Sequence, residues 1–290
     1  PIWRSSLKGS ATAANSSCEQ RMGMSSPLRL DCATRSSTEA SLVAAFGCTA
    51  EALHAFVADP AIDQYFEKHC DRLPEFERWL FQRACERLGQ PRLPDEICWF
   101  HGTRVPEGTT FSEGLLPLGA WLPRLRASVI ATLDDAAAIR EVSLAFDREG
   151  GFGMQFRIKL KQPIHWGPYA ILVREVADNP RAVSQHDYLS MPEIIEDLCD
   201  DVRLASGLDL LANFEDRWRP AMVKFVAPTR SPSSGEFALA TALCYLRDIA
   251  LKGRPSKNSV RCFNGENNPI PPERILGIEW VVRPGIRVAA

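Results

Sequence analysis

The sequence predicts an α+β fold, in which short strands and helices follow one another without a fixed order. Residues 39–90 carry apolar side chains at helical spacing, whereas short apolar or alternating runs recur after Pro94. The two patterns do not alternate in the regular order of a parallel β-α-β sheet, and the chain has no internal repeat. These observations favour the α+β class over a parallel α/β fold.

The composition is that of a folded protein with a sizeable core. Of the 290 residues, 45% are hydrophobic and 9% aromatic, which excludes a wholly disordered or fibrous chain. The 34 Lys and Arg residues nearly balance the 36 Asp and Glu residues, whereas a broad nucleic-acid-binding face needs an excess of cations. No apolar run approaches the roughly 20 residues that cross a bilayer. We therefore expect a soluble protein with no nucleic acid and no membrane as partner.

The nine cysteines are scattered along the chain. Their number is odd and no CxxC pair occurs, which argues against a zinc ribbon or a thioredoxin-like site. The five histidines form no HxxxH pair. We therefore expect no metal site, and free thiols that are typical of a reducing compartment such as the cytoplasm.

Residues 1–38 differ in composition from the remainder. They include nine serines and five basic residues but only two acidic ones, Glu19 and Asp31. Such a segment buries too little apolar area to offset its ordering entropy, so we expect a disordered leader. Ser-rich, acid-poor leaders resemble the export signals of bacterial injected effectors and organelle transit peptides. Composition alone favours a plain unstructured N-terminus over either signal.

Residues 39–94 are expected to form a helical subdomain. Thr38 is the expected N-cap of the first helix, whose apolar residues include Leu42 and Phe46. Asp59-Pro60 starts another helix with proline in its first turn. A third helix is expected from Pro74 to Gly89.

Residues 95–290 are expected to form the main domain, in which short apolar runs alternate with helical segments. A buried strand ends in a turn at Gly102-Thr103, and a Pro/Ser/Gly-rich surface loop covers residues 228–235. The expected strands are Ile97–His101, Ser128–Thr132, Gly153–Leu160, Met222–Val226 and Arg274–Val282. The expected helices are Asp134–Phe146, Tyr169–Ala177 and Phe237–Leu251.

The most informative string is Trp99-Phe100-His101-Gly102-Thr103-Arg104, followed by the string EGLLP at residues 113–117. A histidine directly before a glycine at a strand end places the imidazole and the glycine backbone at one cleft. Glycine also lets a flat ring approach the backbone closely. Two further strings follow, ATLDDAA at residues 131–137 and IPPERILGIEW at residues 270–280.

In this order, the strings resemble ADP-ribosyltransferases of the diphtheria-toxin-like and poly-ADP-ribose-polymerase type. They match the family's HG(T/S) strand with its EGL-like loop, the start of the helix before its third strand, and its closing strand. The resemblance covers residues 97–162 and 269–282. It implies split antiparallel sheets and NAD⁺ as substrate. No GxGxxG string accompanies a β-α-β unit, so a Rossmann-type NAD site is not expected.

The resemblance also implies roles for individual residues. His101 would hydrogen-bond a ribose hydroxyl and the Gly102 backbone would pair with the nicotinamide carboxamide, while Thr103 completes the motif. Arg104 would reach a phosphate, although a solvated arginine is the alternative, as a satisfied core histidine is for His101. The candidates for flanking the nicotinamide are Thr132, Phe152 and Tyr188.

The chemistry further needs a carboxylate, because breaking the bond between ribose and nicotinamide develops positive charge at the anomeric carbon. The family places a glutamate at the start of a late strand, and Glu193, Glu196 and Glu266 are the candidates here, with Glu193 first. If residues 193–198 form a strand, only one of the first two glutamates faces the cleft. If Ser190 caps a helix instead, with Pro192 in its first turn, both belong to an ordinary acidic face.

The expected function is mono-ADP-ribosyl transfer from NAD⁺ to a protein side chain, which is a glycosyltransferase reaction. The resemblance to injected effectors implies a secreted toxin acting in the host cytoplasm, with ubiquitin threonine as the first acceptor to consider. Two alternatives stay open. An NAD-dependent RNA 2′-phosphotransferase would need basic residues around the cleft, and a non-catalytic interaction module would keep only the scaffold.

Overall fold

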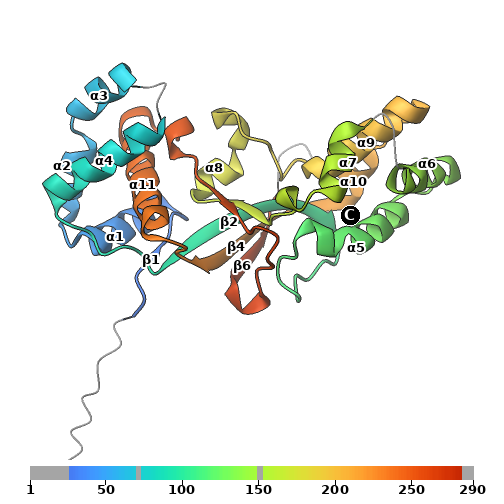
Figure 1. The fold of residues 1–290 in the computed structure, drawn as a ribbon, viewed down its shortest axis with the longest axis horizontal. Helices are drawn as coiled ribbons and strands as arrows, with labels where there is room; N and C mark the ends of the chain where they lie inside the picture. Colours follow the sequence, from blue (N-terminus) through green and yellow to red (C-terminus); the bar gives the residue numbers. More distant parts are fainter. Residues whose placement is uncertain (1–25, 70–72, 149–152, 283–290) are drawn as a thin grey trace, which may run out of the picture.

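The computed structural model describes residues 26–69, 73–148 and 153–282, which form one six-stranded sheet with helices at both of its ends (Figure 1). The strand order is β5-β3-β2-β4-β6, and all these neighbours are antiparallel. The short β1 pairs in parallel with the start of β2. The α+β class predicted from the sequence is therefore confirmed. The strands are β1 (Arg29–Leu30), β2 (Glu96–Pro106), β3 (Tyr169–Ile171), β4 (Trp218–Pro228), β5 (Cys262–Asn264) and β6 (Ile275–Trp280).

The helices gather in two groups, with α1 to α4 and α11 at one end of the sheet and α5, α6, α7, α9 and α10 at the other (Figure 1). The helices are α1 (Arg35–Phe46), α2 (Ala50–Val57), α3 (Ala61–His69), α4 (Leu73–Leu88), α5 (Leu118–Thr132), α6 (Ala136–Asp147), α7 (Met154–Lys161), α8 (Arg174–Asp178), α9 (Glu193–Ser206), α10 (Leu211–Arg217) and α11 (Pro232–Lys252). Four short 3₁₀ helices are η1 (Pro163–His165), η2 (Pro180–Val183), η3 (Lys257–Ser259) and η4 (Pro272–Arg274).

The first group of helices and the sheet share one hydrophobic core, which we call the sheet half. Leu42 of α1, Leu53 of α2 and Leu80 of α4 are buried in the same cluster as Leu243 of α11 and Phe225 of β4. The helices of residues 39–94 are confirmed. They do not form a subdomain with a core of its own, because α11 and the sheet complete their apolar contacts.

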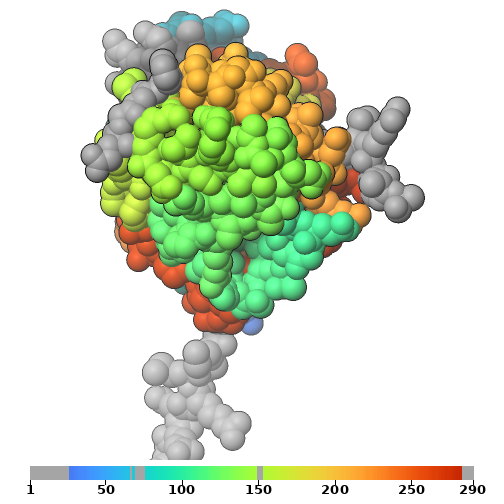
Figure 2. Space-filling view, turned by 90° about the vertical axis from the view of Figure 1, so that its right-hand side faces the viewer, coloured from blue at the N-terminus to red at the C-terminus, as the bar shows by residue number. Residues whose placement is uncertain are grey.

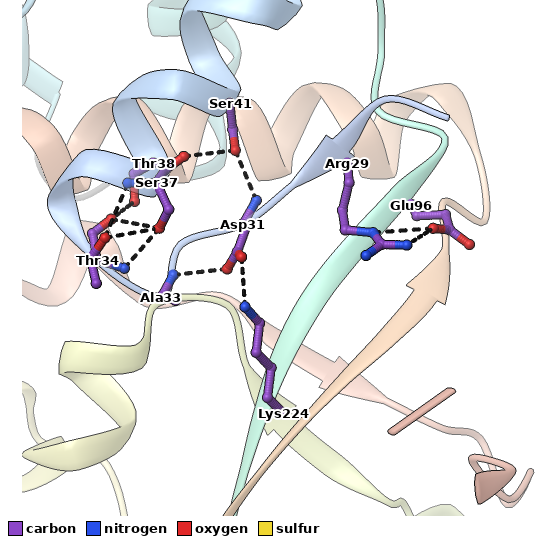
Figure 3. A network of polar contacts seen from close by, with 9 residues as sticks. All are labelled: Arg29, Asp31, Ala33, Thr34, Ser37, Thr38, Ser41, Glu96 and Lys224. Atoms are coloured by element: carbon purple, nitrogen blue, oxygen red, sulfur yellow. Dashed lines mark hydrogen bonds and ion pairs between the residues drawn. The ribbon is translucent and has the colours of Figure 1, made fainter. Parts of the chain in front are cut away.

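The segment before α1 is tied to the sheet by ion pairs (Figure 3). Arg29 Nη2 lies 2.8 Å from a Glu96 carboxylate oxygen, and Lys224 Nζ lies 2.6 Å from Asp31 Oδ2. The prediction of a disordered leader is therefore wrong for residues 26–38. The ion pairs and the burial of Leu30 offset the entropic cost of ordering this segment. Residues 1–25 lie outside the described part of the chain.

Helix α1 begins earlier than the sequence predicted. Thr34 is the N-cap, and its hydroxyl accepts a hydrogen bond from the Ser37 amide at 3.1 Å (Figure 3). The Ser37 hydroxyl in turn accepts from the Thr34 amide at 2.9 Å, which completes a capping box. Thr38, the predicted N-cap, lies inside the helix, where its buried hydroxyl donates to the Thr34 carbonyl at 2.7 Å.

The second group of helices forms a separate core, which we call the helix half. Val129 of α5, Val142 of α6, Phe156 of α7, Ile195 of α9 and Phe214 of α10 are all fully buried in it. Figure 2 looks onto this end of the molecule and shows these helices packed into one continuous surface. Arg104, described below, joins the helix half to β2 through hydrogen bonds of its side chain.

Two predicted strands of the helix half are helices in the structure. Residues 128–132 form the end of α5, and residues 154–160 lie in α7. The alternation in the sequence of α7 was misleading because only Phe156 of this helix is buried, and one helical face accommodates it. The helix predicted at residues 169–177 is instead β3 followed by α8.

The three strands predicted for β2, β4 and β6 are correct in place, but the first two were predicted too short and the third, Arg274–Val282, too long. β2 runs through the predicted turn at Gly102-Thr103, because these residues pair with Met222 and Ala221 of β4. β4 and α11 likewise extend beyond the predicted bounds, so α11 takes in part of the expected loop at 228–235. The closing strand is confirmed as β6.

Within the described residues, no single helix has the length and apolar composition to cross a membrane. Only α1 and α2 taken together reach those criteria, and they meet at a bend of 104°.

Candidate functional site

A cavity of about 370 Å³ lies at the edge of β2, next to the point where its pairing with β3 ends. β4 pairs with β2 along its whole length, whereas β3 pairs with it only at Phe100. Beyond Phe100, the described strands leave this edge of β2 open. The cavity is bounded there by β2, β3, η1, the loop before α9 and the first turn of α9.

His101 lies on β2 and lines this cavity. Its Nδ1 is 2.6 Å from the carbonyl oxygen of Tyr169. Because a carbonyl only accepts, Nδ1 carries the hydrogen and donates it. Burial lowers the pKa of the His101 imidazole, although this hydrogen bond partly opposes the effect. A neutral imidazole with Nδ1–H leaves Nε2 as an acceptor for a ligand hydroxyl.

Gly102 and Thr103 follow on the same wall of the cavity. The loop residues Leu189 and Tyr188 pass directly over Gly102, where a Cβ would lie 3.4 Å from Leu189 Cγ and 3.7 Å from Tyr188 Cβ. These are ordinary van der Waals distances, so the fold itself tolerates a methyl group there. A side chain at this position would therefore lie against Leu189 and beside Tyr188, which lines the cavity.

Glu193 is the first residue of α9 and also lines the cavity. One of its carboxylate oxygens lies 3.0 Å from Lys159 Nζ of α7. Burial raises the pKa of the Glu193 carboxyl, but the hydrogen bond and charge of Lys159, aided by His186 and Tyr188, outweigh burial and lower it. Glu193 is therefore an ionised carboxylate in a largely apolar cavity at neutral pH.

The other two candidate glutamates lie away from the cavity wall. Glu196 is on α9, where its carboxylate lies 3.8 Å from His186 Nδ1, and its pKa is raised mainly by burial. Glu266 lies in the turn after β5 and pairs with Arg230 at 2.6 Å. Glu196 lies three residues after Glu193 on α9, beyond the residues of this helix that line the cavity.

Arg104 is not placed to bind a phosphate, contrary to the expectation. Its side chain is only 1% exposed. The guanidinium donates to the carbonyls of Trp218 at 3.0 Å, Ser190 at 3.1 Å and Glu215 at 2.6 Å, and more weakly to that of Leu189. Arg104 therefore joins β2 to the loop before α9 and to α10, which makes it a structural link between the two halves.

Thr132 is also not placed to flank a ligand. It ends α5 in the core of the helix half, where its hydroxyl donates to the Ser128 carbonyl and accepts from Trp218 Nε1, each at 2.8 Å. Phe152, the second candidate, lies outside the described residues. Tyr188, the third candidate, lines the cavity, and burial together with Glu193 raises the pKa of its hydroxyl.

Several aromatic residues of the cavity were missed by the sequence analysis. Trp166 and Tyr169 flank the cis peptide bond Gly167-Pro168 and line the cavity with Trp121. The string WGPY at residues 166–169 is the only local signal for them, since glycine and proline mark a turn between two aromatic side chains. Lys159 was missed because its segment was predicted to be a strand.

A second chamber of about 440 Å³ adjoins the first. The two share His101, Thr103, Leu116 and Trp121 in their walls. The second chamber is more polar, and its lining includes the hydroxyl-bearing residues Thr109, Thr110, Ser112 and Ser128. Its wall includes the Glu113–Arg124 ion pair, so the EGLLP string contributes to the cleft.

Across residues 26–69, 73–148 and 153–282, no group of three His, Cys, Asp or Glu side chains is placed to hold a metal ion. No protein-family model, no curated protein and no solved structure matches this chain.

Proposed function

We propose that this protein transfers ADP-ribose from NAD⁺ to a side chain of another protein. The observation that supports the proposal most is that Glu193 lines the same cavity as His101 and Gly102, although it lies far from this pair in the sequence. A histidine-glycine pair on a strand and an ionised carboxylate are the two parts that the family resemblance requires.

The residues supply the chemistry in a simple division. Nε2 of neutral His101 accepts a hydrogen bond from a ribose hydroxyl, while the open edge of β2 at Gly102 is offered to the nicotinamide carboxamide. The Glu193 carboxylate accepts from the ribose 2′-hydroxyl and stabilises positive charge at the anomeric carbon. The glycosidic electron pair leaves with neutral nicotinamide, and the acceptor side chain bonds to the anomeric carbon and loses its proton.

The shape of the cleft fits a two-part substrate. The first chamber is mostly apolar and lined by Tyr188, Trp166 and Tyr169, which suits a flat nicotinamide ring. The adjoining chamber has a more polar wall with several serine and threonine residues, which suits the polar remainder of a dinucleotide. His101 and Thr103 belong to both walls and so stand at the junction.

The RNA 2′-phosphotransferase alternative is disfavoured by the state of the cations near the cavity. Lys159 is paired with two carboxylates, and Arg104 is engaged by backbone carbonyls. Neither cation is offered to an RNA phosphate. A non-catalytic module with the same cavity would bind NAD⁺ or nothing, and would release no nicotinamide.

The proposed acceptor is a protein, and ubiquitin is the first to test, with threonine as the modified residue. Secretion as an effector that acts in a host cytoplasm is part of the same proposal. Its support is the Ser-rich composition at the start of the chain together with the family resemblance.

Intact-mass analysis of ubiquitin incubated with the protein and NAD⁺ tests the reaction class. We expect an added mass of one ADP-ribose with the wild-type protein, and its loss with Glu193→Gln and with His101→Ala. Glu266→Gln is the matched control, because that carboxylate lies away from the cavity wall. Equal labelling by wild type and Glu193→Gln, with folding retained, contradicts the assignment of Glu193.

A further inference from the structure

We propose that Lys159 is a positioning residue, which fixes the Glu193 carboxylate at the cavity wall and is itself anchored by Asp197. The inference rests on the proposed function, because it assigns Glu193 its supporting partner in that reaction.

The geometry of the three side chains is that of one cation between two acids. Glu193 and Asp197 are four residues apart on α9, so they share one helical face. Lys159 reaches them from α7, with its Nζ 3.0 Å from a Glu193 oxygen and 2.5 Å from an Asp197 oxygen. The contact to Asp197 is shorter, and only the Glu193 end lines the cavity together with Lys159.

Lys159 and Asp197 are more buried than Glu193, as expected if they hold the Glu193 carboxylate in place. The side chains of Lys159 and Asp197 are 16% and 19% exposed, whereas that of Glu193 is 38% exposed. Lys159 and Asp197 are therefore more shielded from solvent than Glu193, whose carboxylate remains partly exposed at the cavity wall. Lys159 loses side-chain freedom on burial, and two ion pairs offset that loss.

The charge count of the cluster points to a role beyond packing. One carboxylate is enough to neutralise a buried ammonium group, and Asp197 provides it at the shorter distance. Glu193 adds a second carboxylate, so the cluster places two acidic side chains around one ammonium group, a formal net charge of −1. This excess negative charge faces the cavity, where it stabilises positive charge that develops on a bound substrate.

Other titratable groups also face Glu193, and the test must separate them from Lys159. Tyr188 and His186 lie in the loop before α9, and Glu196 follows one turn later on α9 itself. The negative charge of Glu193 also raises the pKa of Tyr169 on β3. Cys262 of β5 contributes to the raised pKa of Tyr188. Lys159 is the one lysine among these groups, and its ammonium makes the direct ion pair.

The test compares Lys159→Met with Lys159→Arg and with the matched control Lys161→Met. Lys161 lies on the same helix, but it is exposed and takes no part in the cavity wall. The first measurement is the ¹³C NMR titration of the Glu193 carboxyl, assigned by its disappearance in Glu193→Gln. We expect Lys159→Met to raise the titration midpoint by about 1 pH unit, because a cation in contact favours the ionised carboxylate. Lys159→Arg and Lys161→Met are expected to leave it near the wild-type value.

The second measurement is the pH dependence of nicotinamide release from NAD⁺. In Lys159→Met the acid limb is expected to move to higher pH with the NMR midpoint, and Asp197→Asn is expected to shift it less. An unchanged midpoint in Lys159→Met, or faster release by that variant at every pH, would overturn the inference. If the midpoint moves but the wild-type protein releases no nicotinamide, the proposed function fails while the support of Glu193 by Lys159 stands.

Discussion

The two halves of the molecule are stabilised by different interactions, and the cavity lies where the two halves meet. In the sheet half, β2 and β4 pair residue by residue over their full lengths, so that the backbone around His101 is fixed by hydrogen bonds. In the helix half, short helices pack side by side, and position depends on side chains such as Phe156. The sheet half therefore offers a rigid backbone to a ligand, whereas the helix half offers the charged side chains Lys159 and Glu193.

The link between the halves is expected to carry the largest effect on stability. Arg104→Met removes a buried guanidinium that donates to carbonyls of the loop before α9, of α10 and of β4. We expect a loss of about 3–5 kcal/mol in the free energy of unfolding, since several buried acceptors lose a charged donor. Urea denaturation measures this loss.

Arg219→Met is the control for that experiment, because Arg219 is 46% exposed and pairs at the surface with Glu107. Its removal is expected to cost less than about 1 kcal/mol. Equal losses for the two arginines would show that β2 and the helix half are not joined through Arg104.

Within the helix half, Thr132 is expected to stabilise the fold through its buried hydrogen bond with Trp218 and to have no part in ligand binding. Thr132→Val leaves the buried Trp218 Nε1 without its acceptor. We expect a loss of about 1–3 kcal/mol in unfolding free energy. The dissociation constant for NAD⁺, measured by calorimetry on the folded variant, should be unchanged. A weaker affinity at retained folding would return Thr132 to the site.

At the edge of the sheet half, the capping box of α1 is expected to have a smaller effect. Thr34→Ala removes the side chain that caps the helix, at a cost of about 1 kcal/mol in unfolding free energy. Ser36→Ala, at an exposed position of the same turn, should change little. Thermal unfolding compares the two, and equal melting temperatures would argue against Thr34 as the cap.

Gly102 is expected to have the smallest effect on stability and a large one on binding. A Cβ at this position meets Leu189 and Tyr188 at ordinary contact distances. The free energy of unfolding of Gly102→Ala should therefore lie within about 0.5 kcal/mol of the wild-type value. NAD⁺ affinity should fall at least about tenfold, which corresponds to 1.4 kcal/mol, because the methyl group would stand beside Tyr188 in the cavity wall and next to the Gly102 backbone that is offered to the carboxamide. Unchanged affinity would remove Gly102 from the proposed site.

The same contrast decides how much the sequence could predict. In the sheet half, the apolar run Ile97–Phe100 predicted a strand correctly, because consecutive residues of β2 are buried on both of its faces. The run at residues 275–280 also predicted a strand correctly, although most residues of β6 are exposed. In the helix half, the eight residues of α7 alternate in polarity by chance. Nothing local distinguishes a strand from a helix with one buried residue, Phe156.

The candidate site divides in the same way. His101 and Gly102 could be predicted as candidates because they are adjacent residues of one strand. The structure places both on the cavity wall. The choice among Glu193, Glu196 and Glu266 could not be predicted, because it depends on where α9 and the turn after β5 lie in the fold. Lys159 carried no local signal at all, since its role follows only from the packing of α7 against α9.

Calorimetric titration of NAD⁺ into the wild-type protein and into His101→Ala tests the central claim most directly, because it needs no acceptor. We predict saturable one-site heat for the wild type and an affinity at least about tenfold weaker for the variant, a difference of 1.4 kcal/mol, since His101 loses its contact with the ribose. Absence of heat in the wild type, or the same affinity in both proteins, would contradict an NAD⁺ site at the open edge of β2.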